Sequence, residues 1–134
     1  MYENFSPRAQ RILVALAQDE AYFLGSRQID PEHIILALLK SAEGLGYVVL
    51  QQLRINVLTL QLAIEQSLPS RFPDTELKTI PNSDRTERFL NQAAFDAKTM
   101  QCNYVGTEHL LFAAATEERS LLWAYLKRAG ISIE

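Results

Sequence analysis

Apolar residues recur at helical spacing along this chain, in segments that begin at capping residues and end at short turns. The first segment follows Ser6, has a proline at its first helical position, and ends at Gly25. The second begins at Asp30 and Pro31, and its apolar run through residues 34–39 is too continuous for a surface helix. The pattern predicts an amphipathic helix followed by a buried central one.

Five further segments with the same period favour an all-α fold. Asn56 and Ser83 are suitable caps for two of them. Between the two halves, residues 69–82 contain three prolines and many polar residues, a composition typical of a surface linker. The five predicted helices span residues 47–54, 57–68, 84–100, 108–115 and 120–129.

One pattern occurs twice: IDPEHIILALL begins at Ile29, and VGTEHLLFAAA begins at Val105. In each copy a capped amphipathic helix and a short loop precede a buried helix that starts with Glu-His. We predict two pseudo-twofold-related repeats of about four helices, at residues 5–68 and 83–134, within one compact domain spanning 1–134. The second copy stops where the fourth helix of the first would begin. Either the natural chain ends early, or this sequence is part of a longer one.

Composition narrows the possible functions. The 134 residues suffice for one hydrophobic core, and the net charge of −3 gives no basic footprint for a nucleic acid. No apolar stretch reaches the length that spans a bilayer, so we expect no membrane partner. Cys102 is the only cysteine and cannot form an internal disulfide. We therefore expect a cytoplasmic protein.

Four stretches of the chain follow one another in a fixed order: FSPRAQRIL, ALAQDEA, EHIILALL and, after a proline-rich linker, YVGTEHLL. Together they resemble the amino-terminal double repeat of the Clp AAA+ unfoldases, closest to the ClpC type. The resemblance runs from Phe5 to about Ser132. It implies an all-α module, attached ahead of ATPase rings, that captures substrates and adaptor proteins. For ClpC-type modules it also implies recognition of phosphoarginine-marked proteins, with a site in each repeat.

The resemblance further implies the partners of the module. They are a Clp ATPase ring in the same or another chain, adaptor proteins, unfolded or phosphoarginine-marked proteins, and the Clp protease. In a plastid system the location would be the stroma. The chain lacks a Gly-x-x-x-x-Gly-Lys-Ser/Thr phosphate-binding loop, so we expect no ATP hydrolysis, no cofactor and no catalysis of its own.

By resemblance, Glu32 and Glu108 take the guanidinium-binding positions, and Ser6 and Ser83 lie near the hydroxyl residues that open each repeat. The chemistry suits the ligand, because a carboxylate pairs with a guanidinium and amides at a helix N-terminus hold phosphoryl oxygens. A glutamate in a first turn is also favoured by the helix dipole whatever the function, so a purely stabilising role stays open.

The two copies differ around these glutamates. In the second, Gly106 and Thr107 offer amides and a hydroxyl to an anion. In the first, Asp30 stands where an anion would dock, and Pro31 removes an amide. We therefore predict weaker phosphoryl binding in the first repeat and rank Glu108 ahead of Glu32.

The first helix also carries one extra residue, near ILVALAQ. Ser6 lies 26 positions before Glu32, whereas Ser83 lies 25 positions before Glu108. An added residue rotates one end of a helix by about 100° relative to the other. This predicts that Ser6 and Ser83 face differently.

Two alternatives to the unfoldase module remain. One is a stand-alone accessory protein of this fold that docks on or stabilises the Clp protease complex. The other is a small enzyme in which Glu32, His33, Glu108 and His109 face one another. The two histidines do not belong to a His-Glu-x-x-His or Cys-x-x-Cys pattern, so a core or capping role is favoured over a metal site.

Overall fold

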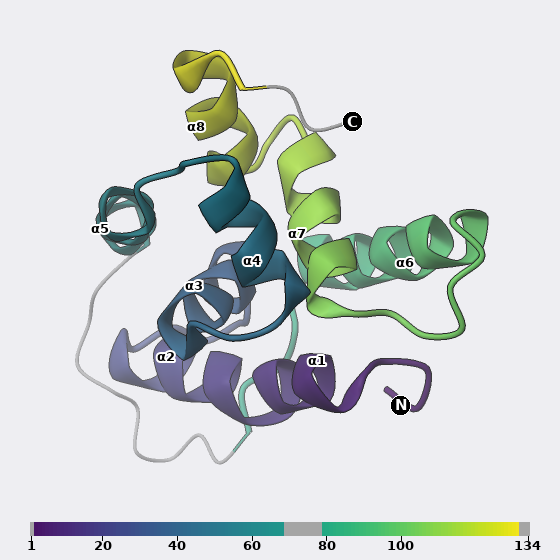
Figure 1. Cartoon of the computed structure of the whole chain (residues 1–134). Helices are drawn as coiled ribbons and strands as arrows, with labels where there is room; N and C mark the ends of the chain where they lie inside the picture. The colour runs from purple at the N-terminus through teal and green to yellow at the C-terminus, as the bar shows by residue number, and fades with distance from the viewer. Residues whose placement is uncertain (1, 69–78, 132–134) are drawn as a thin grey trace.

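The computed structural model describes residues 2–68 and 79–131, and within these ranges it consists of helices joined by turns and two isolated β-bridges. The all-α prediction is confirmed. The first helix is continuous through three consecutive segments, α1, η1 and α2, so the described residues form seven helices (Figure 1). The helical segments of the described residues are α1 (Pro7–Arg11), η1 (Ile12–Leu16), α2 (Ala17–Phe23), α3 (Pro31–Ser41), α4 (Leu45–Gln52), α5 (Val57–Ser67), α6 (Asp84–Thr99), α7 (Thr107–Thr116) and α8 (Leu121–Ala129).

Local capping chemistry determines where the helices begin. Ser6, Asn56, Ser83 and Ser120 each have extended backbone, and each side chain accepts a hydrogen bond from the amide three residues later. At the C-terminus of α8, Gly130 adopts the left-handed conformation with φ of 69°, which costs glycine little. Caps act within one turn, and for this reason the sequence located most helix starts correctly.

The first helix does contain an extra residue, but the prediction that Ser6 and Ser83 therefore face differently is wrong. Ile12–Leu16 form a π-helix, whose wider turn accommodates one added residue inside an otherwise regular α-helix. Ser6 and Ser83 keep equivalent places, because the amide of each bonds to the carbonyl that precedes the cap of the other repeat's buried helix, at Val105 and Ile29 respectively. The insertion is absorbed locally, and the two caps face their neighbours in the same way.

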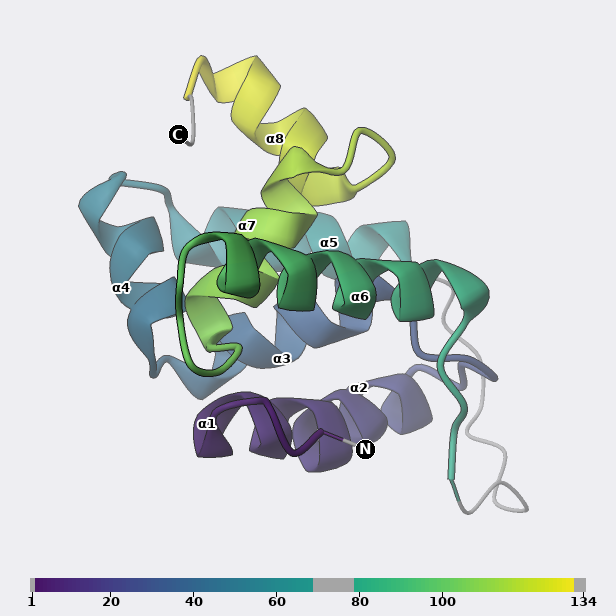
Figure 2. The same ribbon diagram turned by 90° about the vertical axis from the view of Figure 1, so that its right-hand side faces the viewer.

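The helices that carry Glu-His form the centre of the molecule. In α3 every residue from His33 to Leu39 is buried, and α7 is nearly as enclosed. The two helices contact each other, and between them they touch α2, α4, α5, α6 and α8 (Figures 1 and 2). Each repeat therefore buries the apolar helix of the other, as predicted.

Two short parallel β-bridges join the halves crosswise. Ser6 donates its amide to the carbonyl of Val105 at 2.7 Å, and Ser83 donates to the carbonyl of Ile29 at 3.0 Å. The start of α1 is thus fixed beside the start of α7, and the start of α6 beside the start of α3. In each repeat, the first helix therefore begins beside the start of the buried helix of the other repeat.

Some predictions fall outside the described residues. Most of the proposed linker, residues 69–78, is in this group, as are the last three residues. No single helix among the described residues is long and apolar enough to cross a bilayer; one pair bent by 81°, α3 with α4, passes by length and composition only.

The two buried histidines cap their own helices, as predicted. His33 is 1 % exposed, and its Nδ1 accepts the Asp30 amide at 2.9 Å while Nε2 lies 3.0 Å from the Ser26 hydroxyl. His109 accepts the Gly106 amide at 2.9 Å in the same way. Each histidine occupies the position that glutamate or glutamine holds in a capping box.

Burial lowers the pKa of His33 below its ordinary value of 6.5, against the opposing effect of nearby Asp30, Glu32 and Glu20. The unfolded chain then binds a proton that the folded chain does not, so stability present above pH 6.5 is lost as the pH falls toward the folded pKa. We predict that the free energy of unfolding decreases between about pH 7 and about pH 5, measured by urea denaturation.

His33→Gln is the matched control, because a glutamine oxygen can accept the same amide without titrating. Its stability should vary less with pH than that of the unsubstituted chain over this range. An identical pH dependence in both chains would contradict the assignment to His33.

Candidate functional site

The structure pairs the predicted site residues across the repeats. The sequence interpretation placed Ser6 with Glu32 and Ser83 with Glu108. Instead, Ser6 lines a cleft with Glu108, while Ser83 bonds to Ile29, close to Glu32 along the chain. The crossed β-bridges are the physical reason, because they exchange the neighbours of the two helix starts. The structure therefore has two composite regions, each built from both repeats.

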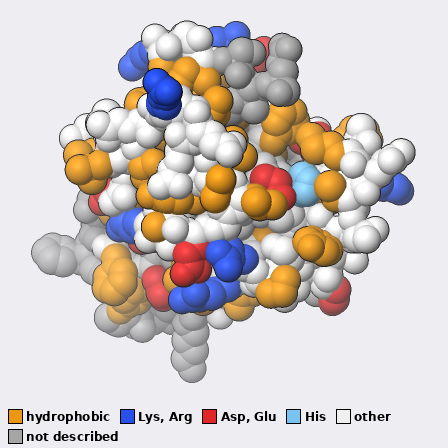
Figure 3. Space-filling view, viewed as in Figure 1, with side chains coloured by type: hydrophobic (Ala, Val, Ile, Leu, Met, Phe, Trp, Pro, Cys, Tyr) orange, Lys and Arg blue, Asp and Glu red, His pale blue; other side chains and the backbone are white. Residues whose placement is uncertain are grey.

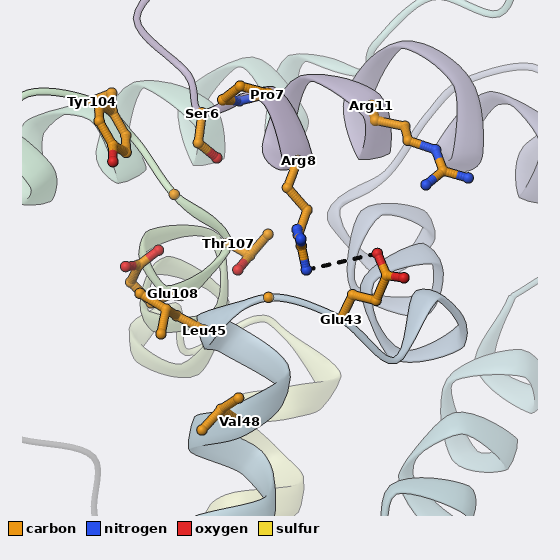
Figure 4. A pocket seen from close by; sticks show the side chains of 12 residues that line it. Ser6, Pro7, Arg8, Arg11, Glu43, Leu45, Val48, Tyr104, Thr107 and Glu108 are labelled. Carbon is orange, nitrogen blue, oxygen red and sulfur yellow. Dashed lines mark ion pairs between the residues drawn. The ribbon is translucent and has the colours of Figure 1, made fainter.

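The region around Glu108 is an open cleft of about 780 Å³ (Figure 4). Charged side chains lie beside hydrophobic ones on the face of the molecule seen in Figure 3. Three apolar side chains on the cleft wall are exposed: Leu45 at 60 %, Val48 at 42 % and Tyr104 at 59 %. The lining residues come from the start of α1, from α4 and the turn before it, and from α7 and the loop before it: Ser6, Pro7, Arg8, Arg11, Glu43, Gly44, Leu45, Val48, Tyr104, Gly106, Thr107 and Glu108.

Glu108 is available to a ligand. Within the described part of the chain its carboxylate has no hydrogen bond or ion pair. It folds back over Gly106, where any side chain would overlap Oε1, so glycine at 106 makes room for it. The carboxylate thus lies in the cleft with its hydrogen-bonding capacity unused.

Two other predicted ligands of this cleft are already engaged. The Gly106 amide donates to His109, and the buried Thr107 hydroxyl accepts the Gly46 amide at 3.0 Å. The Gly106 amide is therefore not free for an anion, whereas the Thr107 hydroxyl accepts one bond and keeps its own O–H as a donor. The amides of Thr107 and Glu108, in the first turn of α7, have no intrahelical acceptor and remain for an anion.

The region around Glu32 is closed by an arginine. Arg85 donates two hydrogen bonds to the Glu32 carboxylate, Nη1 to Oε1 at 2.7 Å and Nη2 to Oε2 at 2.9 Å. Its Nε donates to Oε1 of Glu117 at 3.0 Å, and Nη2 also reaches the carbonyl of Arg119 at 3.4 Å. Paired, forked hydrogen bonds are the strong form of arginine–carboxylate contact. Glu32 is therefore engaged within the chain itself.

The same three residue types surround the cleft in an open arrangement. Arg8 and Arg85 each lie two positions after a capping serine, and Glu43 and Glu117 each follow the buried helix of their repeat. Arg8, however, turns to Glu43 at 3.7 Å and not to Glu108 (Figure 4). We call Glu32, Arg85 and Glu117 the closed triad, and Glu108, Arg8 and Glu43 the open triad.

Burial separates the two triads. Side chains of the closed triad are 12 % (Glu32), 26 % (Arg85) and 28 % (Glu117) exposed, whereas Arg8 and Glu43 are 51 % and 55 % exposed. Hydrogen bonding to Glu32 raises the pKa of Arg85 above its ordinary value, although burial opposes this. The closed triad is a partly buried ion-pair network, whereas the open triad holds one solvated ion pair beside an unpaired carboxylate.

Sequence reasoning missed both arginines and their second carboxylates. A signal was present, because SPR at Ser6 and SDR at Ser83 place an arginine at the same offset in both repeats. Which carboxylate each arginine reaches depends on the crossed arrangement of the repeats, and this is not a local property.

Both histidines of the enzymatic alternative are engaged in capping. Nδ1 of both His33 and His109 accepts a backbone amide, and each ring is at most 4 % exposed. Within residues 2–68 and 79–131, no group of three or more His, Cys, Asp or Glu side chains could hold a metal ion.

The structure thus defines an all-α domain of two crossed helical repeats with an open, mixed-charge cleft between them. The model of the Clp repeat (R) N-terminal domain matches residues 4–129, and the chain belongs to this family. The resemblance inferred from the sequence is confirmed.

Among curated relatives, the negative regulator of genetic competence ClpC/MecB of Bacillus subtilis is 34% identical over 133 residues, which cover 99% of this chain and 16% of that protein. The uncharacterized protein Rv2667 of Mycobacterium tuberculosis is 35% identical over 112 residues, or 84% of this chain and 43% of that one. This chain thus spans less than half the length of either relative.

Solved structures share the fold. A ClpV N-domain in complex with a VipB peptide superposes with a TM-score of 0.79 at 20% identity, covering 96% of this chain and 79% of that one.

The two triads should contribute differently to stability. Arg85→Ala leaves two partly buried carboxylates unpaired, and we predict a loss of about 2–3 kcal/mol, between the values for exposed and fully buried pairs. Arg8→Ala breaks a solvated pair and should cost less than about 1 kcal/mol. Urea denaturation followed by circular dichroism measures both, and equal losses would contradict the distinction.

Proposed function

We propose that this chain is a substrate- and adaptor-recognition domain of a Clp-type ATP-dependent unfoldase/protease system, with no catalysis of its own. Membership of the Clp repeat family supports the general role. The observation that supports the location of the site is the unpaired Glu108 carboxylate in a cleft with exposed apolar walls. The Clp ATPase ring, the protease and adaptor proteins are the partners this role requires.

Phosphoarginine-marked proteins are the substrate class that the cleft chemistry favours. Glu108 would pair with the guanidinium, while the Thr107 and Glu108 amides and the Ser6 hydroxyl would hold phosphoryl oxygens. Arg8 and Arg11, on the opposite wall, add positive charge for the phosphoryl group. One small region thus supplies both charges that this zwitterionic ligand requires.

The apolar wall favours a ligand presented on a polypeptide. Leu45, Val48 and Tyr104 would contact residues that flank the modified arginine, because exposed apolar side chains beside a polar site are typical of protein-binding surfaces. Peptide binding by the structurally similar ClpV N-domain supports this use of the fold.

A stand-alone accessory protein of the Clp complex is the second candidate. It is favoured by the relative Rv2667, in which the matched segment makes up 43% of the chain, compared with 16% in ClpC/MecB, so the domain occurs in proteins of very different length. Nucleotide-binding motifs encoded directly downstream in the same gene would exclude this candidate.

Calorimetric titration with free phosphoarginine tests the assigned cleft. We predict saturable binding that weakens about 10- to 100-fold in Glu108→Ala, because a hydrogen-bonded charged group contributes about 1.5–3 kcal/mol. Glu32→Ala is the matched control and should bind almost as the unsubstituted chain does, since Arg85 already occupies Glu32. Equal losses in both variants, or none in either, would contradict the assignment.

A further inference from the structure

The closed triad has the composition of a binding site with its ligand in place. Arg85 contributes a guanidinium, Glu32 binds it through two parallel hydrogen bonds, and Glu117 accepts a hydrogen bond from Nε. The backbone carbonyl of Arg119 adds a fourth acceptor. These acceptors contact every nitrogen of the Arg85 side chain, whose five N–H donors are fixed in one plane.

We propose that Arg85 is a built-in occupant of the first-repeat site, so that this chain has one open recognition site and a second site closed by its own side chain. Vacating the site would create a receptor for an alkylguanidinium group from another molecule. The role of the open cleft rests on the proposed function, but the occupancy of the Glu32 site does not.

Comparison with the open triad shows how the contacts of Arg85 differ from an ordinary surface ion pair. Arg8 has the same offset from its capping serine, but it makes one contact of 3.7 Å and its side chain is half exposed. Arg85 makes two contacts below 3.0 Å with a carboxylate that is 12 % exposed. The same residue types therefore produce a closed and an open arrangement within one molecule.

The surroundings of Arg85 allow a small ligand to replace its side chain. A cavity of about 370 Å³ adjoins the closed triad and is lined by Arg85, Arg88, Gln92, Thr116 and Glu117, among others. Oε2 of Glu117 is buried and has no hydrogen-bond partner among the described residues. Removing Arg85 would thus leave an accessible space bordered by two carboxylates with unused acceptors.

Chemical rescue with ethylguanidinium, a fragment of the arginine side chain, tests the inference. All variants carry Glu108→Ala, so that the open cleft cannot contribute. Adding Arg85→Ala should lower the melting temperature, and ethylguanidinium at ten times its dissociation constant should raise it again by about 5 °C. Adding Arg88→Ala, on the same helix but outside the triad, should give no such rise.

A third variant checks where the ligand binds. With Glu32→Gln added to Arg85→Ala, the rise should disappear, since the forked carboxylate is gone. If Arg85→Ala alone does not fold, adding Glu117→Gln removes one unpaired carboxylate, and the same rise is expected through Glu32.

Two results would overturn the inference: no rise in the Arg85→Ala variants, or an equal rise in Arg88→Ala. Because Glu108 is absent throughout, failure of phosphoarginine to bind the open cleft would leave this result unaffected. Failure of the rescue would in turn leave the open cleft unaffected.

Discussion

The packing of α3 against α7 is the constraint on which the rest of the structure depends. Neither apolar helix can be covered by its own repeat, so each is enclosed by elements of both repeats. Burying these helices also buries their first turns, where backbone amides need partners. His33 and His109 supply those partners from within the same turn, so the helix starts can approach the opposite repeat without an unpaired amide at the cap.

The crossed arrangement then determines the chemistry of each site. A glutamate on the buried helix of one repeat meets an arginine from the first helix of the other, and the turn after the opposite buried helix adds a second carboxylate. Geometry and burial decide which of the two carboxylates the arginine binds. The arginine binds the buried-helix glutamate in the closed triad, whereas in the open triad it pairs with the turn glutamate and leaves Glu108 free.

The sequence predicted local features well and crossed contacts poorly. The caps at Ser6, Asp30 and Ser83 and the buried run of α3 were predictable, because capping and periodicity act within a few residues. The added residue in the first helix could be recognised in the sequence. Its effect could not, because a π-turn can absorb an insertion without rotating the cap. Arg85 was missed because its partners lie 53 and 32 positions away.

Nuclear magnetic resonance of the arginine side chains tests the central claim most directly, namely that one triad is closed and the other open. In a sample labelled with ¹⁵N, the Nε–H of Arg85 should exchange slowly with water, and its Nη protons should give separate signals, because fixed hydrogen bonds stop rotation of the guanidinium. Arg8 should give averaged, rapidly exchanging signals, since its contact is long and solvated. The variants Arg85→Lys and Arg8→Lys assign the two signals. Averaged signals for both arginines would contradict the account.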